Sequence, residues 1–267
     1  MKESILTIND IRVSYFDSLK GETTIIFIHG FPFDKSSWNL QLEQLRENFR
    51  VIAYDIRGFG NSSSGEKQFS IDLFADDLLS FMDALKINQA IICGLSMGGY
   101  IALNAIARFP KRFHKLILSD TQCVGDSSEA KEKRYKTIEL LNNGGLKQWL
   151  TAFEKNLFIE SSFVEKENEV EEIRSMMLTN PIYTLVSTLK ALAERKDTCA
   201  LLKDISVPTL IICGESDSIT PLAKSQQLNT EIKSSVLKVI PEAGHLSNVE
   251  QPDIFNKYLS EFVQEGI

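Results

Sequence analysis

The chain has 267 residues, of which 43% are hydrophobic and 24% are charged. This balance is typical of a globular protein and excludes both an intrinsically disordered chain and a coiled coil. The chain carries 29 Lys and Arg against 36 Asp and Glu, a formal net charge of −7. That charge argues against a nucleic-acid partner, because phosphate backbones are bound by clustered cations.

Short apolar runs alternate with longer amphipathic stretches along the chain. We expect an opening hairpin of two strands, followed by six further strands, at 5–8, 12–16, 23–28, 51–54, 90–93, 116–118, 209–213 and 236–240. Several of these runs are apolar at successive positions, which is typical of parallel strands buried on both faces. Helices are predicted between the strands, at 37–48, 71–85, 97–109, 225–232 and 254–263. The alternation predicts an α/β fold with a doubly wound, mostly parallel sheet of about eight strands.

The segment from residue 121 to residue 204 interrupts this alternation, because it contains no strand-like run. Helical patterns separated by turn sequences occupy it instead, at 130–141, 146–158, 163–177 and 182–193. A helical block inserted between two parallel strands must lie over the carboxyl edge of the sheet or beside it. We therefore expect two domains: a core formed by residues 1–120 and 205–267, and a helical cap, or lid, formed by residues 121–204.

The most specific motif is Gly94-Leu95-Ser96-Met97-Gly98, which follows a predicted buried strand and opens a predicted helix. In that context G-x-S-x-G predicts a nucleophile elbow, a tight turn that projects the Ser96 hydroxyl from the sheet edge at a helix N-terminus. Gly94, Gly98 and the following Gly99 would leave room for a close approach of strand and helix. The alternative is a glycine turn with an incidental serine, which the flanking strand and helix disfavour.

A serine of ordinary reactivity needs a general base, and the chain has three histidines. His245 follows the last predicted strand, at the sheet edge where ligands bind in open α/β folds, so we expect it to be the base. His114 lies among cations after a helix and is expected at the surface. His29 ends an early strand, and we expect it to shape its loop by bonding the loop that begins at Asp55.

The base in turn needs a carboxylate that holds its tautomer. Asp217 follows the penultimate predicted strand, and the order Ser96, Asp217, His245 is the one expected for a catalytic triad on a doubly wound sheet. Asp217 is therefore our candidate. Two alternatives stay open: Asp120, which ends the strand around 116–119, and Glu215, two residues before Asp217.

Two backbone N–H groups are expected to stabilise an oxyanion in the reaction. The first is the amide of Met97, directly after the candidate nucleophile. The second should come from the loop after the strand at 23–28, where Gly30 permits an unusual turn and Pro32 stiffens the chain; we expect it to be the amide of Phe31. Apolar residues of the cap, Trp149 and Phe153 among them, either pack against one another or face the site.

The four cysteines follow no C-x-x-C or C-x-x-H spacing, so neither a metal site nor a redox pair is predicted. Cys93 and Cys213 lie inside apolar runs, whereas Cys123 and Cys199 stand alone. We expect all four to be buried free thiols. No apolar run approaches the roughly 18 residues of a membrane span, and the first ten residues lack the apolar stretch of a signal peptide. These features together predict a cytoplasmic protein with no membrane partner.

Five motifs together make the chain resemble α/β-hydrolase fold proteins over nearly its whole length: His29-Gly30-Phe31-Pro32, Asp55-x-Arg57-Gly58-Phe59-Gly60-x-Ser62, Gly94-Leu95-Ser96-Met97-Gly98-Gly99, Gly214-Glu215-Ser216-Asp217 and Gly244-His245. Within that superfamily the chain is similar to the small cytosolic branch of carboxylesterases, 3-oxoadipate enol-lactonases, acyl-carrier methyl-ester esterases and cofactor-free haloperoxidase or perhydrolase-like proteins. The resemblance implies the same site: Ser96, Asp217, His245 and the amides of Phe31 and Met97.

We therefore expect a serine hydrolase that cleaves a small or medium acyl ester or lactone through an acyl-enzyme, with a small-molecule ester as its partner and no metal or organic cofactor. Perhydrolysis, in which peroxide replaces water at the acyl-enzyme, is the alternative enzyme activity, and a ligand receptor is the alternative of another class. Dehalogenation and epoxide hydrolysis are disfavoured, because they use a carboxylate nucleophile where this chain has Ser96. The natural ester and the oligomeric state stay open.

Overall fold

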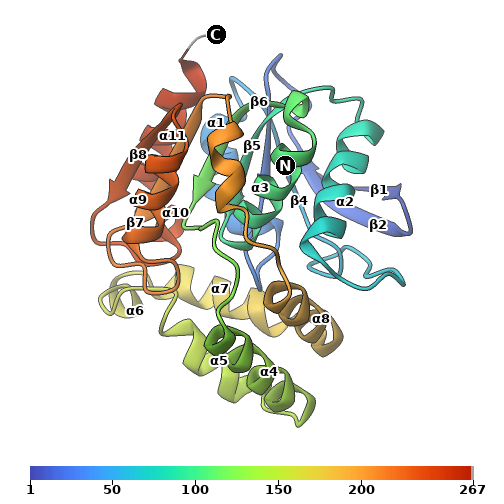
Figure 1. The fold of residues 1–267 in the computed structure, drawn as a ribbon, viewed down its shortest axis with the longest axis vertical. Helices are drawn as coiled ribbons and strands as arrows, with labels where there is room; N and C mark the ends of the chain where they lie inside the picture. Colours follow the sequence, from blue (N-terminus) through green and yellow to red (C-terminus); the bar gives the residue numbers. More distant parts are fainter. Residues whose placement is uncertain (266–267) are drawn as a thin grey trace.

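A single eight-stranded sheet forms the centre of the computed structural model, which describes residues 1–265 (Figure 1). The strand order is β1-β2-β4-β3-β5-β6-β7-β8. Strands β1 (Glu3–Ile8) and β2 (Ile11–Asp17) form the predicted antiparallel hairpin, and β2 pairs antiparallel with β4. The remaining strands pair in parallel: β3 (Thr24–Ile28), β4 (Arg50–Tyr54), β5 (Ala90–Leu95), β6 (Phe113–Ser119), β7 (Thr209–Gly214) and β8 (Ser235–Ile240). The predicted fold class is confirmed.

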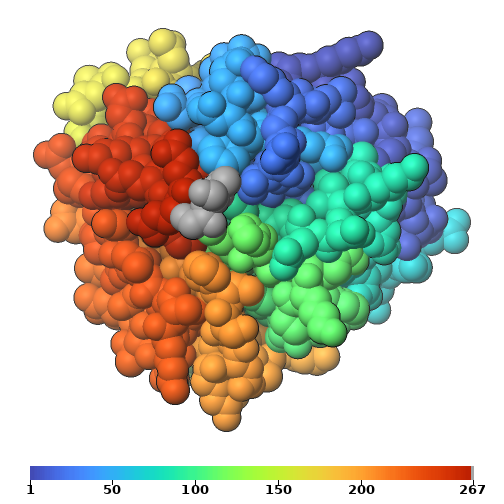
Figure 2. Space-filling view, turned by 90° about the horizontal axis from the view of Figure 1, so that it is seen from above, coloured from blue at the N-terminus to red at the C-terminus, as the bar shows by residue number. Residues whose placement is uncertain are grey.

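The helices of the sheet region lie in two groups. The chain steps from β3 to β4 and then back past β3 to β5, so right-handed crossovers place α1 on the face opposite α2 and α3. The contacts agree, because α1 (Asn39–Leu45) packs on α11 (Pro252–Gln264), whereas α2 (Ile71–Ala84) packs on α3 (Met97–Arg108). Figure 2, seen from above, shows the α1 and α11 regions side by side. Helix α9 (Leu222–Glu231) packs on β7 and β8.

Local sequence explains how these helices begin. The hydroxyl of Ser70 accepts a hydrogen bond from Leu73 N (3.0 Å), which caps α2 close to its predicted start. Pro252 stands in the first turn of α11, where its missing N–H leaves no bond unmade. The predicted helix at 37–48 is shorter than expected. Asp34 caps a 3-10 turn, η1 (Lys35–Trp38), before α1 begins.

Five α-helices lie between β6 and β7 and gather below the sheet in Figure 1. We call them the cap helices: α4 (Ser128–Asn142), α5 (Leu146–Glu154), α6 (Ser162–Glu165), α7 (Glu167–Leu178) and α8 (Ile182–Ala193). The helical character predicted for this segment is therefore confirmed. The pattern at 163–177 is two helices rather than one, because Lys166 leaves the helical conformation, with φ −131° and ψ 41°.

The loop that follows β4 is held by buried ion pairs. The carboxylate of Asp55 accepts hydrogen bonds from the amide and the ammonium group of Lys35 (2.8 and 2.7 Å). Arg57 is buried and donates twice to Asp77 (2.7 and 2.9 Å) and once to Asp10 (2.8 Å). The motif around Asp55 and Arg57 is therefore a structural one, in which each buried charge has a partner of opposite sign.

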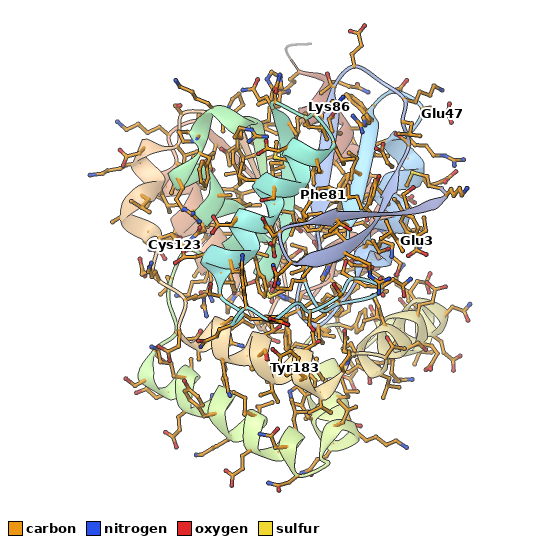
Figure 3. The ribbon with its side chains drawn as sticks, turned by 90° about the vertical axis from the view of Figure 1, so that its right-hand side faces the viewer. Glu3, Glu47, Phe81, Lys86, Cys123 and Tyr183 are labelled. Atoms are coloured by element: carbon orange, nitrogen blue, oxygen red, sulfur yellow. A yellow bond between two sulfur atoms is a disulfide. The ribbon has the colours of Figure 1, made fainter. Side chains whose placement is uncertain are left out.

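The prediction that all four cysteines are free thiols is wrong for two of them. Cys123 and Cys199 form a disulfide, whereas Cys93 and Cys213 are free and buried as expected. The pair is 76 residues apart in sequence, so no local spacing signals it. It forms because the segment that follows α8 returns beside the segment that follows β6, where Thr198 N also donates to Cys123 O (2.9 Å). Figure 3 shows Cys123 where the chain passes from the sheet region to the cap helices.

Breaking this disulfide should lower the free energy of unfolding by about 2–4 kcal/mol, because the bond closes a long loop and restricts the unfolded chain. Urea unfolding with and without a phosphine reductant measures the change. In the control variant Cys123→Ser the reductant should have no effect on the midpoint. An unchanged midpoint for the fully reduced wild type would contradict the prediction.

No helix within residues 1–265 is long and apolar enough to cross a bilayer.

Candidate active site

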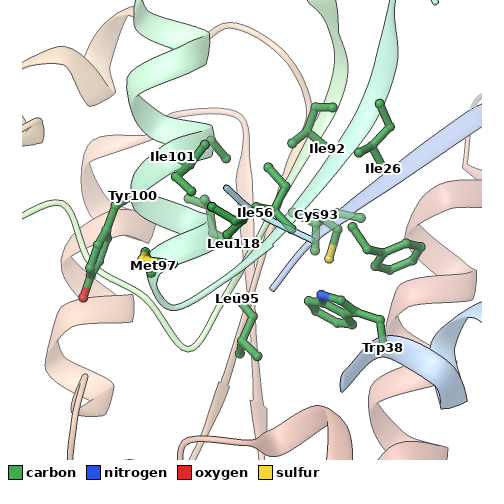
Figure 4. Packing of buried hydrophobic residues seen from close by; sticks show 14 of the residues in the cluster. Ile26, Trp38, Ile56, Ile92, Cys93, Leu95, Met97, Tyr100, Ile101 and Leu118 are labelled. Atoms are coloured by element: carbon green, nitrogen blue, oxygen red, sulfur yellow. The ribbon is translucent and has the colours of Figure 1, made fainter. Parts of the chain in front are cut away.

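Ser96 occupies a sharp turn between β5, which ends at Leu95, and α3, which begins at Met97. Its φ of 51° and ψ of −111° lie outside the regions that a side chain normally allows, and such strain is typical of functional positions. The turn is held from two sides, because Ser96 N donates to Ser119 O (2.9 Å) and Ser96 O accepts from Thr121 Oγ1 (2.7 Å). This is the strained turn that the motif predicts. Figure 4 shows Leu95 and Met97 flanking it among buried residues of β5 and α3.

The glycines around this turn allow three elements to approach closely. A Cβ atom on Gly98 would overlap the carbonyl oxygen of Ile28 at the end of β3, and one on Gly94 would overlap the carbonyl of Gly98. A Cβ atom on Gly30 would lie only 3.2 Å from Cβ of Ser96. The loop that follows β3 therefore lies directly beside Ser96.

The amide of Phe31, predicted to bind an oxyanion, lies on that loop. Within residues 1–265, Phe31 N donates no hydrogen bond, while Phe33 N donates to Gly30 O (3.0 Å) and closes the turn. Met97 N stands at the first position of α3, where an amide has no acceptor within the helix. Both amides are thus available to a ligand oxygen, and the adjacent Gly30 and Ser96 place them at one edge of the sheet.

His29 has the loop-shaping role expected of it. Its Nε2 accepts a hydrogen bond from Ile56 N (3.0 Å) and its Nδ1 donates to Gly30 O (2.9 Å). The ring is fully buried, and this burial lowers its pKa. His114 is exposed, as predicted. Neither imidazole forms a hydrogen bond to Ser96 within the described chain.

His245 and Asp217 are brought together by the loops that follow β8 and β7. Nδ1 of His245 lies 2.8 Å from Oδ2 of Asp217, and both side chains are buried. The carboxylate also accepts hydrogen bonds from Ile219 N (2.8 Å), Thr220 N (2.9 Å) and Thr220 Oγ1 (2.7 Å). A carboxylate in this position fixes the proton on Nδ1 and leaves the lone pair on Nε2. Thr220 was not anticipated, although a threonine three residues after an aspartate in a turn is a recognisable signal.

The charges around His245 favour its protonated form. Burial alone would lower the pKa of His245, but the contact with Asp217 and the charges of Asp120 and Glu250 outweigh it and raise that pKa. Burial would raise the pKa of Asp217; the charge and hydrogen bond of His245, with those from Thr220, hold it well below its usual range. The imidazole therefore accepts a proton more readily than an ordinary histidine does.

The two alternative acids form no hydrogen bond to the base within residues 1–265. Asp120 is buried and accepts hydrogen bonds from Gly214 N (2.8 Å), Ser119 Oγ (2.8 Å) and Ser247 Oγ (2.6 Å), so it ties the end of β6 to the loops that hold Asp217 and His245. Burial and the nearby charge of Asp217 raise the pKa of Asp120. Glu215 is exposed. Of the three candidates, Asp217 alone is hydrogen-bonded to His245 within residues 1–265.

Ser96 Oγ forms no hydrogen bond to His245 in the described structure. Hydrogen bonds between nucleophile and base are often long without substrate and tighten when it binds. The structure thus pairs the predicted acid and base, and it sets the predicted nucleophile beside the predicted oxyanion loop.

The cap helices reach this loop through aromatic contacts. The Phe31 ring lies against Trp149 and Phe153 of α5, with ring centres 5.9 and 6.4 Å apart, and those two rings stack at 5.2 Å. The sequence left open whether these cap residues pack against one another or face the site. Trp149 and Phe153 pack against each other and also against Phe31, the candidate oxyanion residue. A separate cavity of about 480 Å³ lies between the helix pair α2–α3 and the cap; Tyr100, Asn104, Tyr135 and Arg195 line it, but Ser96 does not.

Comparisons with known proteins agree with this architecture. A family model described as alpha/beta hydrolase fold matches residues 23–252. The 3-oxoadipate enol-lactonase 2 of Acinetobacter baylyi is 31% identical over 252 residues, which cover 94% of this chain and 92% of that protein. A putative non-heme chloroperoxidase of Synechocystis sp. is 30% identical, with 94% of each chain covered. The structure of a thermophilic esterase from Thermogutta terrifontis superimposes with a TM-score of 0.94 at 32% identity over 99% of each chain. The chain belongs to the alpha/beta hydrolase fold family, in the branch that holds enol-lactonases and esterases.

Proposed function

We propose that this hydrolase cleaves small or medium acyl esters or lactones through a Ser-His-Asp triad. Ser96 is the nucleophile, His245 the general base and Asp217 the residue that orients the base. The observation that carries the proposal is the 2.8 Å hydrogen bond between His245 and Asp217, on loops adjoining the sheet edge where Ser96 stands in a strained turn. The esterase and enol-lactonase relatives support an ester or lactone as the substrate.

The proposed cycle has two halves. Ser96 Oγ attacks the carbonyl carbon while Nε2 of His245 takes its proton, and the amides of Phe31 and Met97 hold the oxyanion, each being worth about 3 kcal/mol. The tetrahedral intermediate collapses as His245 protonates the leaving alkoxide, and Ser96 stays acylated. A water molecule then gives a proton to His245 and attacks the acyl group, which releases the acid and restores the serine. This cycle uses no metal and no organic cofactor.

The cap belongs to the same proposal. Residues 121–204 act as a lid over the sheet edge, and residues 1–120 with 205–267 form the domain that carries the triad. The contact of Trp149 and Phe153 with Phe31 supports this division, because it sets an apolar wall from the cap beside the oxyanion loop. Such a wall favours an apolar acyl or alcohol group over a charged one.

Covalent labelling of Ser96 tests the mechanism. A phosphonofluoridate probe should add one label per chain on the peptide that contains Ser96, and p-nitrophenyl acetate should give a burst of one equivalent of p-nitrophenol. Ser96→Ala should lose the label and the burst while keeping the wild-type circular dichroism. The control is Ser128→Ala, at an exposed serine of the cap, which should behave like the wild type. Undiminished turnover in Ser96→Ala would refute the proposal.

Perhydrolysis is a second candidate, favoured by the similarity to the Synechocystis chloroperoxidase. Hydrogen peroxide would replace water in the second half of the cycle and release a peracid in place of an acid. The triad is the same for both reactions. Quantifying peracid and acid formed from one acyl donor, at matched peroxide concentrations, distinguishes the two activities.

We also propose a cytoplasmic location, which rests on the sequence features described above. The Cys123–Cys199 disulfide argues in the other direction, because disulfides persist mainly in oxidising compartments. The expectation of four free cysteines, which supported a cytoplasmic location, therefore no longer does so. Fractionation of cells that make the protein naturally, with immediate alkylation of free thiols, tests it.

A further inference from the structure

Glu250 is a fully buried carboxylate at the end of the short helix α10 (Ser247–Glu250). Its Oε2 accepts a hydrogen bond from Gly244 N (2.5 Å), the amide directly before His245. Its Oε1 accepts from Ile159 N (2.8 Å) and Ser162 Oγ (2.7 Å), which belong to the cap segment between α5 and α7. One side chain thus bonds the loop of the candidate base and the cap at the same time.

Backbone contacts reinforce this junction. The carbonyl of Leu157 accepts hydrogen bonds from His245 N (2.9 Å) and Leu246 N (3.2 Å). A side chain at Gly244 would be crowded, because a Cβ atom there would lie 3.0 Å from Leu157 O and 3.1 Å from Oε2 of Glu250. The cap segment 157–162 and the base loop 244–246 therefore form one hydrogen-bonded unit.

An apolar residue at position 250 would fill the space but would leave buried N–H groups without acceptors, at about 1–3 kcal/mol for each. A carboxylate serves three donors because it has two oxygens, each with two lone pairs. Resting on the proposed function, we propose that Glu250 is a positioning residue: it couples docking of cap segment 157–162 to the placement of His245 against Asp217.

The charge of Glu250 gives this role a distinct signature. Asp217, Asp120 and Glu250 are the carboxylates that act on His245, and each raises its pKa. Burial raises the pKa of Glu250, and the hydrogen bonds from Ser162, Ile159 and Gly244 with the charge of Lys166 offset only part of that rise. Removing the charge at position 250 should therefore lower the pKa of His245, which a purely structural role would not do.

Glu250→Gln keeps the shape of the side chain but removes its charge and turns one oxygen into an NH₂ group that opposes an N–H donor. We expect kcat on p-nitrophenyl acetate to fall by about 10- to 100-fold, with KM changed by less than about threefold. The acidic limb of the kcat/KM profile should move to lower pH, since the neutral imidazole is the active form and its pKa falls. Hydrogen exchange at the amides of Ile159 and Gly244 should accelerate, with exchange in α2 unchanged.

Ser162→Ala is the matched control. It removes one cap-side donor and leaves the charge and the Gly244 bond in place, so the acidic limb should not move.

If Glu250→Gln does not fold, Glu250→Asp replaces it as the test variant. The shorter side chain keeps the charge but cannot reach both partners, so kcat should fall while the acidic limb stays unchanged. Wild-type kcat in either variant at position 250, or a loss of kcat in Glu250→Gln with an unmoved acidic limb and unaltered exchange, would overturn the proposal. Failure of Ser96 labelling in the wild type would instead refute the proposed function. Hydrogen exchange at Ile159 and Gly244 would still test whether Glu250 joins the cap segment to the loop of His245.

Discussion

Replacing Asp217 with asparagine is expected to lower kcat/KM for an activated ester by about 10⁴-fold. An amide NH₂ in place of Oδ2 donates to Nδ1 of His245, so the imidazole proton moves to Nε2 and the lone pair that must receive the serine proton is lost. Steady-state kinetics on p-nitrophenyl acetate measures the loss. In the wild type, kcat/KM should fall as the pH drops through the pKa of His245, which lies above the ordinary histidine value because Asp217 outweighs burial.

Asp120→Asn is the control for this prediction. It makes the same carboxyl-to-amide change in another buried residue of the site, but Asp120 contacts Gly214, Ser119 and Ser247 and does not contact the imidazole. Its kcat/KM should fall by about tenfold or less. Equal losses in the two variants would mean that the acid function is shared, contrary to the assignment of Asp217.

Arg57→Met is expected to lower the free energy of unfolding by about 3–5 kcal/mol. The guanidinium group is fully buried and bonds both oxygens of Asp77 and one of Asp10. Its removal would leave the buried Asp77 carboxylate without a partner of opposite charge, with only the hydrogen bond from Asn9 Nδ2 (2.8 Å) remaining. Urea unfolding monitored by circular dichroism measures the change.

The matched control is Arg46→Met, the same substitution at a surface pair. Arg46 and Glu43 have side chains that are 37% and 65% exposed, so losing their ion pair should change stability by about 1 kcal/mol or less. A similar decrease in the free energy of unfolding for the two variants would contradict the prediction that the buried Arg57 cluster stabilises the fold more than the surface pair does.

The fold followed from the sequence because its signals are local. Parallel strands buried on both faces must be apolar at successive positions, as at Ala90–Leu95, and the elbow at Ser96 needs glycines that adjoin it in sequence. The chain order of Ser96, Asp217 and His245 then identified the acid and base that the structure pairs. Some helix ends were predicted wrongly, because the turn capped by Asp34 and the break at Lys166 each depend on the conformation of a single residue.

The missed features join residues distant in sequence. The disulfide between Cys123 and Cys199 depends on the segment after α8 returning beside the segment after β6, and no spacing rule encodes that contact. Glu250 meets Ile159 and Ser162 across about 90 residues, as the separations of 91 and 88 show. Pairings of this kind become visible only once the order of the strands is known.

The disulfide also limits how the proposed lid, residues 121–204, could move. It fastens the segment that follows β6 to the segment that follows α8, so the two ends of the lid stay together. An opening that separates α5 from the loop after β3 would therefore have to break the contacts of Trp149 and Phe153 with Phe31 while these two ends stay joined.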